Sequence, residues 1–213
     1  MTEVGLRERK KARTRRVIAD AAARLFAERG YEQVAVSDVA REAEVSEQTV
    51  YNYFQTKEQL VTDLQPYFEE ELDRRIRTRE PGTSPAAAIR ELALEAVEGI
   101  ERVPAEQWRG ELGSLSAMSP TVHRLALEMS DRQAMTIANA IRDTSRVTPE
   151  IARVQGIALA GVFQIIITEA GRRTREGQSQ DQIAGHLRPA IETVLDDLDR
   201  WTAATRHQAA PHQ

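Results

Sequence analysis

Pairs of a hydroxyl residue and a proline constrain the fold of this chain more than any other sequence feature. Serine and threonine cap the first turn of a helix, and proline is favoured at the first helical position. The pairs are Ser84-Pro85, Ser119-Pro120 and Thr148-Pro149, and capping-box patterns begin at Thr56 and Ser179. Because no alternating apolar stretch is long enough for a sheet, the sequence predicts an all-α fold.

Apolar residues repeat with helical spacing between these starts. They predict about nine helices, which span residues 8–29, 37–43, 47–53, 57–79, 85–102, 105–117, 120–145, 149–176 and 180–204. On the first of these helices, Val17, Ile18, Leu25 and Phe26 belong to one apolar stripe that ends before Gly30.

The residue types present exclude several classes of function. The chain of 213 residues has no cysteine, so we expect neither disulfides nor cysteine-ligated metals. Its sequence shows no histidine and carboxylate cluster with ligand spacing, no glycine-rich phosphate loop and no nucleophile beside a base. We therefore predict no catalytic residue, no metal site and no cofactor, and we predict that the protein is not an enzyme.

Hydropathy indicates where the protein resides. The longest nearly apolar run, residues 156–167, is shorter than the about 20 residues that span a bilayer. The N-terminus mixes Glu3 and Glu8 with arginines and lacks the apolar region of a signal peptide. We predict a cytoplasmic protein with no membrane partner.

Basic residues are concentrated near the N-terminus, although the formal net charge of the whole chain is −4. Residues 7–16 hold seven basic side chains and one glutamate, which gives a local charge of +6. Such a patch favours an anionic partner that docks at one end of the molecule. A solvated basic helix start would produce the same pattern.

Residues 36–54 have the pattern of a helix-turn-helix. Val39 and Ala43 are four residues apart on a short helix, Val45 fills the turn, and Val50 and Phe54 form the buried stripe of a second short helix. Helices of this length are unstable alone, so they must pack against the first helix. We predict a three-helix unit whose second short helix projects outward.

The projecting helix carries side chains suited to reading DNA. With Val50 and Phe54 facing inward, Gln48 and Asn52 point away from the core, where amides can pair with base edges. Hydroxyl groups on its flanks suit phosphate oxygens, and Ser37 and Ser46 are predicted helix N-caps near the same backbone. The predicted DNA-binding residues are Arg13, Thr14, Ser37, Ser46, Gln48, Thr49, Tyr51, Asn52, Tyr53 and Lys57.

This stretch resembles the DNA-binding domain of TetR-family transcriptional repressors. The resemblance runs from the basic helix to Leu60 and is most specific in TVYNYFQTKEQL, residues 49–60. It implies a bacterial homodimer that binds a palindromic double-stranded operator and lies at the nucleoid when bound. One position departs from the family pattern, because Glu44 stands in the turn where glycine is usual and positive φ is expected.

We expect three parts along the chain. Residues 1–56 form the N-terminal arm and helix-turn-helix domain, residues 57–204 an effector-binding and dimerisation domain, and residues 205–213 a disordered tail. An apolar cavity between helices would hold a small effector, although ordinary core packing explains the same residues. The predicted effector residues are Leu64, Phe68, Trp108, Leu112, Met118, His123, Met129, Phe163 and Gln164.

The last two predicted helices suggest a dimer interface. One is apolar nearly all round, and the other carries an apolar seam that Pro189 interrupts and is expected to kink. Two helices from each subunit would form a four-helix interface, or the same helices would close the core of a single chain. The predicted interface residues are Ile157, Gly161, Ile165, Leu187, Ile191, Val194, Leu198 and Trp201.

These features together predict a sequence-specific transcriptional regulator. Its partners would be operator DNA, a second copy of the chain and a small apolar effector that changes the separation of the two DNA-reading heads. Repression is favoured over activation. The alternative is a DNA-bound adaptor whose larger domain binds a protein partner instead of a small ligand.

Overall fold

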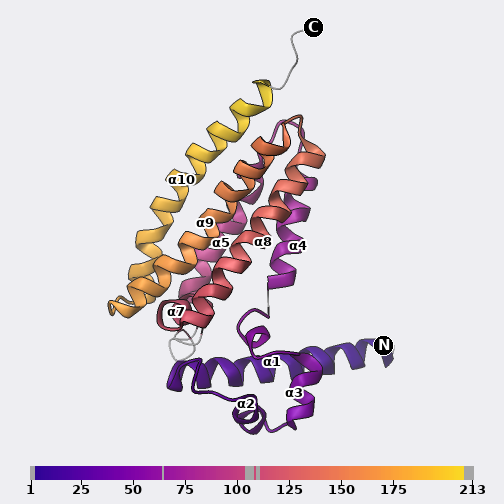
Figure 1. Ribbon diagram of the computed structural model, residues 1–213, viewed down its shortest axis with the longest axis vertical. Coiled ribbons are helices and arrows are strands. Elements are labelled where there is room, and N and C mark those ends of the chain that lie inside the picture. Colours follow the sequence, from indigo (N-terminus) through magenta and orange to yellow (C-terminus); the bar gives the residue numbers. More distant parts are fainter. Residues whose placement is uncertain (1–2, 64, 104–107, 109–110, 209–213) are drawn as a thin grey trace.

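Two groups of helices are stacked on each other in this computed structural model, which describes residues 3–63, 65–103, 108 and 111–208 (Figure 1). Nine α-helices and one 3₁₀-helix account for the regular structure of these described residues, so the predicted all-α class is confirmed. The N-terminal group is α1 (Glu3–Arg29), α2 (Val36–Glu42), α3 (Glu47–Tyr53) and the 3₁₀-helix η1 (Glu58–Leu60). The second group is α4 (Gln65–Arg77), α5 (Pro85–Arg102), α7 (Leu112–Met118), α8 (Pro120–Thr144), α9 (Pro149–Arg175) and α10 (Gln180–Gln208).

The predicted helix starts in the second group are confirmed by their hydrogen bonds. The hydroxyl oxygens of Ser84, Ser119 and Thr148 accept from the backbone N–H groups three residues ahead, at 3.0, 3.1 and 3.4 Å. The capping box at Ser179 is also formed, since its N–H donates to Oε1 of Gln182 at 2.9 Å. Each cap contributes about 1 kcal/mol and sets where its helix begins.

A shared apolar core joins the three helices of the N-terminal domain. Val50 and Phe54 are fully buried against Ile18 and Leu25 of α1, which confirms the predicted inward face of α3. Val17, which the apolar stripe included, is instead 42% exposed because it lies off the inward face of α1. The burial of one face leaves the opposite face of α3 in solvent.

The turn between α2 and α3 is closed by a Schellman motif. The N–H of Val45 donates to the carbonyl oxygen of Ala40 at 2.9 Å, and the N–H of Glu44 donates to that of Arg41 at 3.2 Å. Glu44 has a φ of 54°, so the expected positive φ at this position is confirmed. This conformation costs a residue with a Cβ about 1 kcal/mol relative to glycine.

Helix α9 is the centre of the larger domain. It packs against α5, α7, α8 and α10, and its side chains Leu159 and Phe163 are buried in the main core. By length and composition alone α9 could cross a membrane, with a mean hydropathy of 1.7 over its most apolar 18 residues. The helix extends beyond the apolar run of residues 156–167 at both ends. Because four other helices pack around it, we interpret α9 as the core helix of the larger domain and not as a membrane span.

The two domains meet through α7 and the start of α8. Leu115 of α7 and Val122 of α8 are buried in the core of the N-terminal domain. The hydroxyl of Ser119 hydrogen-bonds the carboxylate of Glu32, which follows α1. Part of the core that supports α3 therefore comes from the larger domain.

Several predicted boundaries are wrong for identifiable reasons. The first helix begins at Glu3 because its charged residues are good helix formers. The single helix expected over residues 57–79 is divided into η1 and α4, which starts at Gln65. The capping box expected at Thr56 is not formed, since Oε1 of Gln59 accepts from the N–H of Gln55 at 2.7 Å instead. Of the helix expected over residues 105–117, residues 105–107 and 109–110 lie outside the described residues, Trp108 is helical, and α7 begins at Leu112 after its N-cap Glu111.

The predicted disordered tail also begins too early. Helix α10 continues to Gln208 through Pro189, because its last turns pack on α9: Thr202 is buried, and Nε2 of Gln155 donates to Oγ1 of Thr205 at 2.6 Å. Residues 209–213 lie outside the described residues.

We predict that Glu44→Gly raises the free energy of unfolding by about 1 kcal/mol, because glycine adopts a positive φ without a Cβ clash. Thermal unfolding should shift upward by about 2–4 °C. Glu44→Ala removes the same charge but keeps the Cβ, so it should give no such gain. An equal gain from both variants would assign the effect to charge instead of backbone strain.

Candidate nucleic-acid interface and adjoining cavity

The exposed face of α3 carries the two predicted base-reading amides. Gln48 and Asn52 are exposed, and Nε2 of Gln48 donates to Oδ1 of Asn52 at 3.2 Å. Tyr51 is 44% exposed beside them, and Tyr53 is half-buried. The two amides hydrogen-bond each other on the exposed face, and they can exchange this bond for bonds to a base edge.

Ser46 caps α3 as predicted. Its Oγ accepts from the N–H of Thr49 at 3.1 Å and lies 2.8 Å from the hydroxyl of Thr49. The prediction that Ser37 is a helix N-cap is wrong, because Ala35 is the N-cap of α2 and Ser37 lies inside its first turn. The carboxylate of Asp38 accepts from the N–H of Ala35 at 3.0 Å, and this hydrogen bond lowers the pKa of Asp38.

Lys57 packs on the domain core. Its Nζ lies 4.2 Å from the ring centroid of Tyr31 and 6.0 Å from that of Phe26. Burial lowers the pKa of Lys57, and the nearby carboxylates of Glu32 and Glu58 oppose that shift. The ammonium group is thus held at a fixed place beside α3 by a cation–π contact.

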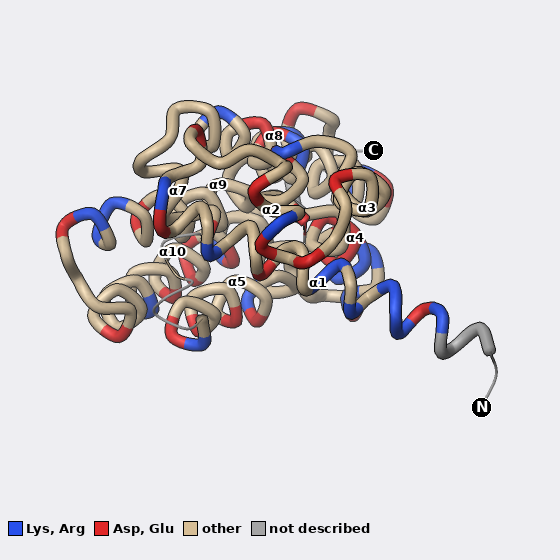
Figure 2. Tube along the Cα trace, turned by 90° about the horizontal axis from the view of Figure 1, so that it is seen from below, with Lys and Arg blue, Asp and Glu red and all other residues tan. Residues whose placement is uncertain are grey.

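The basic N-terminal half of α1 projects beyond the rest of the domain, as Figure 2 shows. Arg13 is exposed there, while Oγ1 of Thr14 donates to the carbonyl oxygen of Lys10 at 3.1 Å along the same helix. Exposed arginines on a projecting helix can reach phosphates on either side of the site that α3 reads.

Arg15 has a structural role that its place in the basic run did not reveal. Its Nε donates to Asp63 at 2.7 Å, its Nη1 donates to the carbonyl oxygen of Tyr53 at 3.0 Å, and its guanidinium lies 4.7 Å from the Phe54 ring centroid. It joins α1 to the end of α3 and to the segment before α4. Sequence alone cannot separate such a half-buried arginine from its solvent-exposed neighbours.

A cavity of about 280 Å³ lies in the larger domain between α4, α5, α7, α8 and α9. Its aromatic walls include Phe68 and Phe163, whose ring centroids are 4.9 Å apart in an edge-to-face arrangement. Two amides add polar atoms, since Nε2 of Gln133 donates to Oε1 of Gln65 at 3.1 Å. Apolar walls with a few polar groups are typical of sites for small organic ligands.

The structure brings together four of the predicted effector residues and separates the others. Phe68, Trp108, Leu112 and Phe163 line the cavity. The remaining predictions fall elsewhere: Met118 and His123 are exposed, Met129 is fully buried away from the cavity lining, Gln164 accepts a hydrogen bond from Ser130, and Leu64 lies outside the described residues.

Sequence reasoning missed the α5 wall of the cavity and three polar residues in it. Ala96, Gly99 and Ile100 supply the α5 wall. The available signal was the apolar stripe along α5, which is also buried at Ile89 and Ala93. The polar residues had no such signal, because Gln65 and Gln133 lie on helices of mixed composition and Glu111 is the residue before α7.

The predicted dimer residues divide between two faces. Ile157 and Ile165 are 53% and 51% exposed on α9 with half-buried Gly161 between them, and Val194 of α10 is 44% exposed. A correction is needed for Leu187 and Ile191, which face α5 in the core of the chain itself. Leu198 and Trp201 are half-buried, and Leu198 packs against that same core.

In the part of the chain that the structure describes, no group of three or more histidine and carboxylate side chains could hold a metal ion.

Comparisons with known proteins agree with this geometry. Residues 18–64 match the bacterial regulatory proteins of the tetR family. The chain is 26% identical over 205 residues to the HTH-type transcriptional regulator TcmR of Streptomyces glaucescens, a match that covers 91% of this chain and 86% of that protein. Among solved structures, the SmeT–triclosan complex has a TM-score of 0.57 at 18% identity over 87% of this chain and 89% of SmeT.

A second solved structure has the same fold. NalD of Pseudomonas aeruginosa, described as the secondary repressor of the MexAB-OprM multidrug efflux pump, has a TM-score of 0.51 at 21% identity over 87% of this chain and 97% of its own.

We predict that Asn52→Ala and Arg13→Ala weaken DNA binding in different ways. Loss of the Asn52 amide should lower affinity for the preferred sequence about ten-fold and leave nonspecific binding unchanged. Loss of Arg13 should weaken binding to all sequences and reduce the slope of log K against log salt by about 1. Fluorescence anisotropy across a salt series, with selected and scrambled duplexes, measures both effects.

If Asn52→Ala and Arg13→Ala changed specific affinity, nonspecific affinity and salt dependence in the same way, the assignment of base reading to Asn52 and phosphate contact to Arg13 would be wrong.

Proposed function

The chain belongs to the TetR family of bacterial regulatory proteins, and we propose that it is a dimeric repressor that leaves its operator when a small apolar effector fills the cavity. Members of this family are DNA-binding transcriptional regulators and not enzymes. Base reading is assigned to Gln48 and Asn52, and phosphate contacts to Arg13, Thr49 and the hydroxyls of Tyr51 and Tyr53.

One observation carries the proposal: the cavity and the DNA-reading domain share helix α7. Leu112 lines the cavity and also packs against the N-terminal core. Leu115, one turn further along α7, is 1% exposed inside that core. An effector that displaces the start of α7 would therefore move part of the support of α1 and α3.

Such a movement matters because an operator constrains both reading heads. Two helices that enter successive major grooves must be about 34–36 Å apart, or a multiple of that distance. A change of a few ångströms in the separation of the heads prevents both from docking together. The structure of SmeT with triclosan supports the use of a small apolar ligand in this fold, and the role of NalD as a repressor supports repression.

The dimer is assigned to the exposed apolar face of α9 and α10. Val154, Ile157 and Ile165 are each at least half exposed on α9, and Val194 extends the face onto α10. A contiguous apolar face of this kind marks an interaction surface, and a two-fold axis allows each copy to cover the other.

We predict that Ile165→Asp converts the dimer to monomer, because it places a charge in the centre of this face. Sedimentation should show half the mass, and affinity for a two-half-site operator should fall by about 100-fold or more, because both heads no longer bind as one unit. Tyr67→Asp, at a residue that is 64% exposed on α4, is the matched control and should remain dimeric. A dimeric Ile165→Asp protein would place the interface elsewhere.

We predict that Gly99→Leu occupies the α5 side of the cavity, prevents an effector from binding and does not displace α7, so that the repressor stays on DNA. Gly99 lines the cavity on α5, and a Cβ at this position meets nothing within 4 Å. The variant should bind operator as tightly as the parent but no longer respond to compounds that release the parent. Helix stability should not fall, because glycine is a poor helix former.

A library screen for release of a fluorescent operator provides the compounds for this test. If Gly99→Leu responds to the same compounds as the parent, the cavity is not the effector site. If no small molecule releases the parent and a second protein copurifies with it, the adaptor function is favoured.

A further inference from the structure

Glu111 brings a negative charge to the wall of the cavity. Among the residues described around the cavity, it is the one that carries a formal charge; the others are apolar residues, glycines and the amides Gln65 and Gln133. Glu111 also lines a second cleft, between α1 and α7, together with Asp20 and Leu112. It therefore stands where the cavity meets the surface of α1.

The carboxylate of Glu111 has no hydrogen bond or ion pair with any described residue. It precedes the first turn of α7 as the N-cap residue but makes no side-chain capping bond there. The two arginines that line the same cleft have other partners, since Arg15 binds Asp63 and Arg16 lies 3.9 Å from Asp20. Burial raises the pKa of Glu111, and the nearby negative charge of Asp20 raises it further.

Other carboxylates of the larger domain behave in the opposite way. Glu71, Glu98 and Glu169 each form hydrogen bonds with one or more arginines, and these bonds lower their pKa values. Among the described residues, these surface carboxylates have arginine partners and Glu111 at the wall of the cavity has none. A partly desolvated charge without a partner among the described residues favours a ligand that brings a cation.

The remaining walls suit the same kind of ligand. Phe68, Phe163 and Trp108 present aromatic surface, which accepts both an apolar body and a cationic head group. The indole N–H of Trp108 already donates to Oγ1 of Thr174 at 2.8 Å, so it is not free to donate a hydrogen bond to an anionic ligand. The cavity has no basic side chain among its described lining residues.

We propose that Glu111 selects effectors that carry a positively charged group, such as a protonated amine, on an apolar body that fits the aromatic walls. The inference rests on the proposed function of the cavity as the effector site. A cation at Glu111 would also offset the repulsion between Glu111 and Asp20, so the charge of the effector acts at the point where α7 meets α1.

Three probes with a common phenylbutyl body test this selection. Isothermal titration without DNA measures the binding of 4-phenylbutylammonium, 4-phenylbutanol and 4-phenylbutyrate to the full-length protein. The parent should bind the cation about ten-fold or more tightly than the alcohol, and the anion least well. Glu111→Gln should bind the cation and the alcohol with similar affinities.

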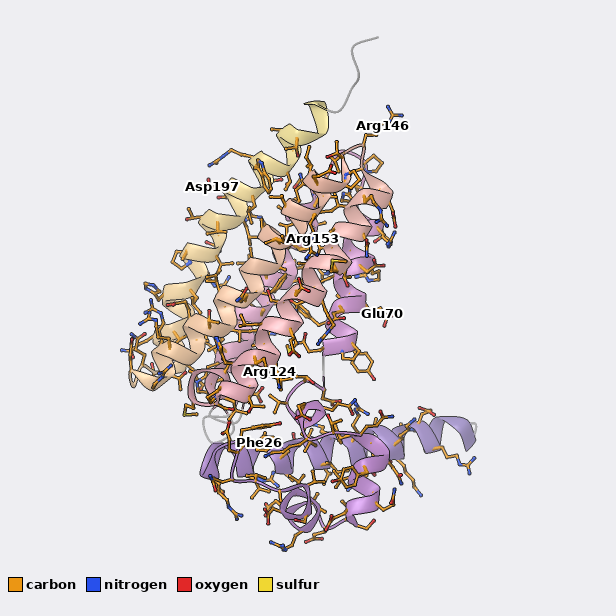
Figure 3. The ribbon with its side chains drawn as sticks, in the orientation of Figure 1. Phe26, Glu70, Arg124, Arg146, Arg153 and Asp197 are labelled. Atoms are coloured by element: carbon orange, nitrogen blue, oxygen red, sulfur yellow. The ribbon has the colours of Figure 1, made fainter. Side chains whose placement is uncertain are left out.

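Two further variants separate charge selection from other effects. Glu70→Gln makes the same change in net charge on α4, at an exposed side chain that points away from the bundle in Figure 3, and it should keep the preference for the cation. Gly99→Leu should lose binding of all three probes. Thermal unfolding without ligand should show Glu111→Gln more stable than the parent, because the substitution removes a charge that burial and the nearby Asp20 disfavour.

Equal affinities of the parent for the three probes, preference for the anion, failure to bind the cation, or unchanged selectivity in Glu111→Gln would overturn the inference. Failure of the proposed function gives a different result. If the cation binds in a manner that depends on Glu111 but leaves operator affinity unchanged, charge selection stands and release by the effector does not.

Discussion

The close contact between α7 and α9 determines how the two domains are joined. A Cβ on Gly171 of α9 would lie 1.9 Å from the carbonyl oxygen of Gly113, so the two helices pack backbone to backbone. This contact holds a short helix that would be unstable alone. With α7 fixed in this way, Leu112 faces the cavity and Leu115 enters the core beneath α1. The helix is supported by one domain and supports the other.

A second connection joins the same two domains at the segment before α4. Arg15 binds Asp63, which follows η1, and the carbonyl oxygen of Tyr53 at the end of α3. Gln65, the first residue of α4, then bonds Gln133 in the cavity wall. The cavity is therefore bounded at two places by segments in contact with the DNA-reading domain: α7 packs against its core, and the segment before α4 continues into it along the chain. A ligand that changes either boundary acts on α1 and α3 through short, packed connections.

The N-terminal domain could be predicted from the sequence in detail because its determinants are local. The cap at Ser46, the buried pair Val50 and Phe54, and the positive φ of Glu44 each depend on residues a few positions apart. The cavity depends on which faces of five helices meet, and sequence spacing does not contain that information. Helix α10 shows the difficulty, since Ile191 and Val194 belong to one apolar seam but face the core and solvent respectively.

One face of helix α9 lines the cavity, and the adjacent face is exposed where we place the dimer interface. The helix therefore connects the cavity to the proposed dimer. Phe163 and Ile166 line the cavity, while Ile165 lies exposed on the face assigned to the second subunit. Because interiors are close-packed, a helix cannot yield to a ligand on one face without shifting the residues on the other. Occupation of the cavity would therefore reach the reading heads by two routes, through α7 within a subunit and through α9 at the two-fold axis. Under the proposed function, both routes would change the separation of the heads, which is the quantity that a palindromic operator would constrain.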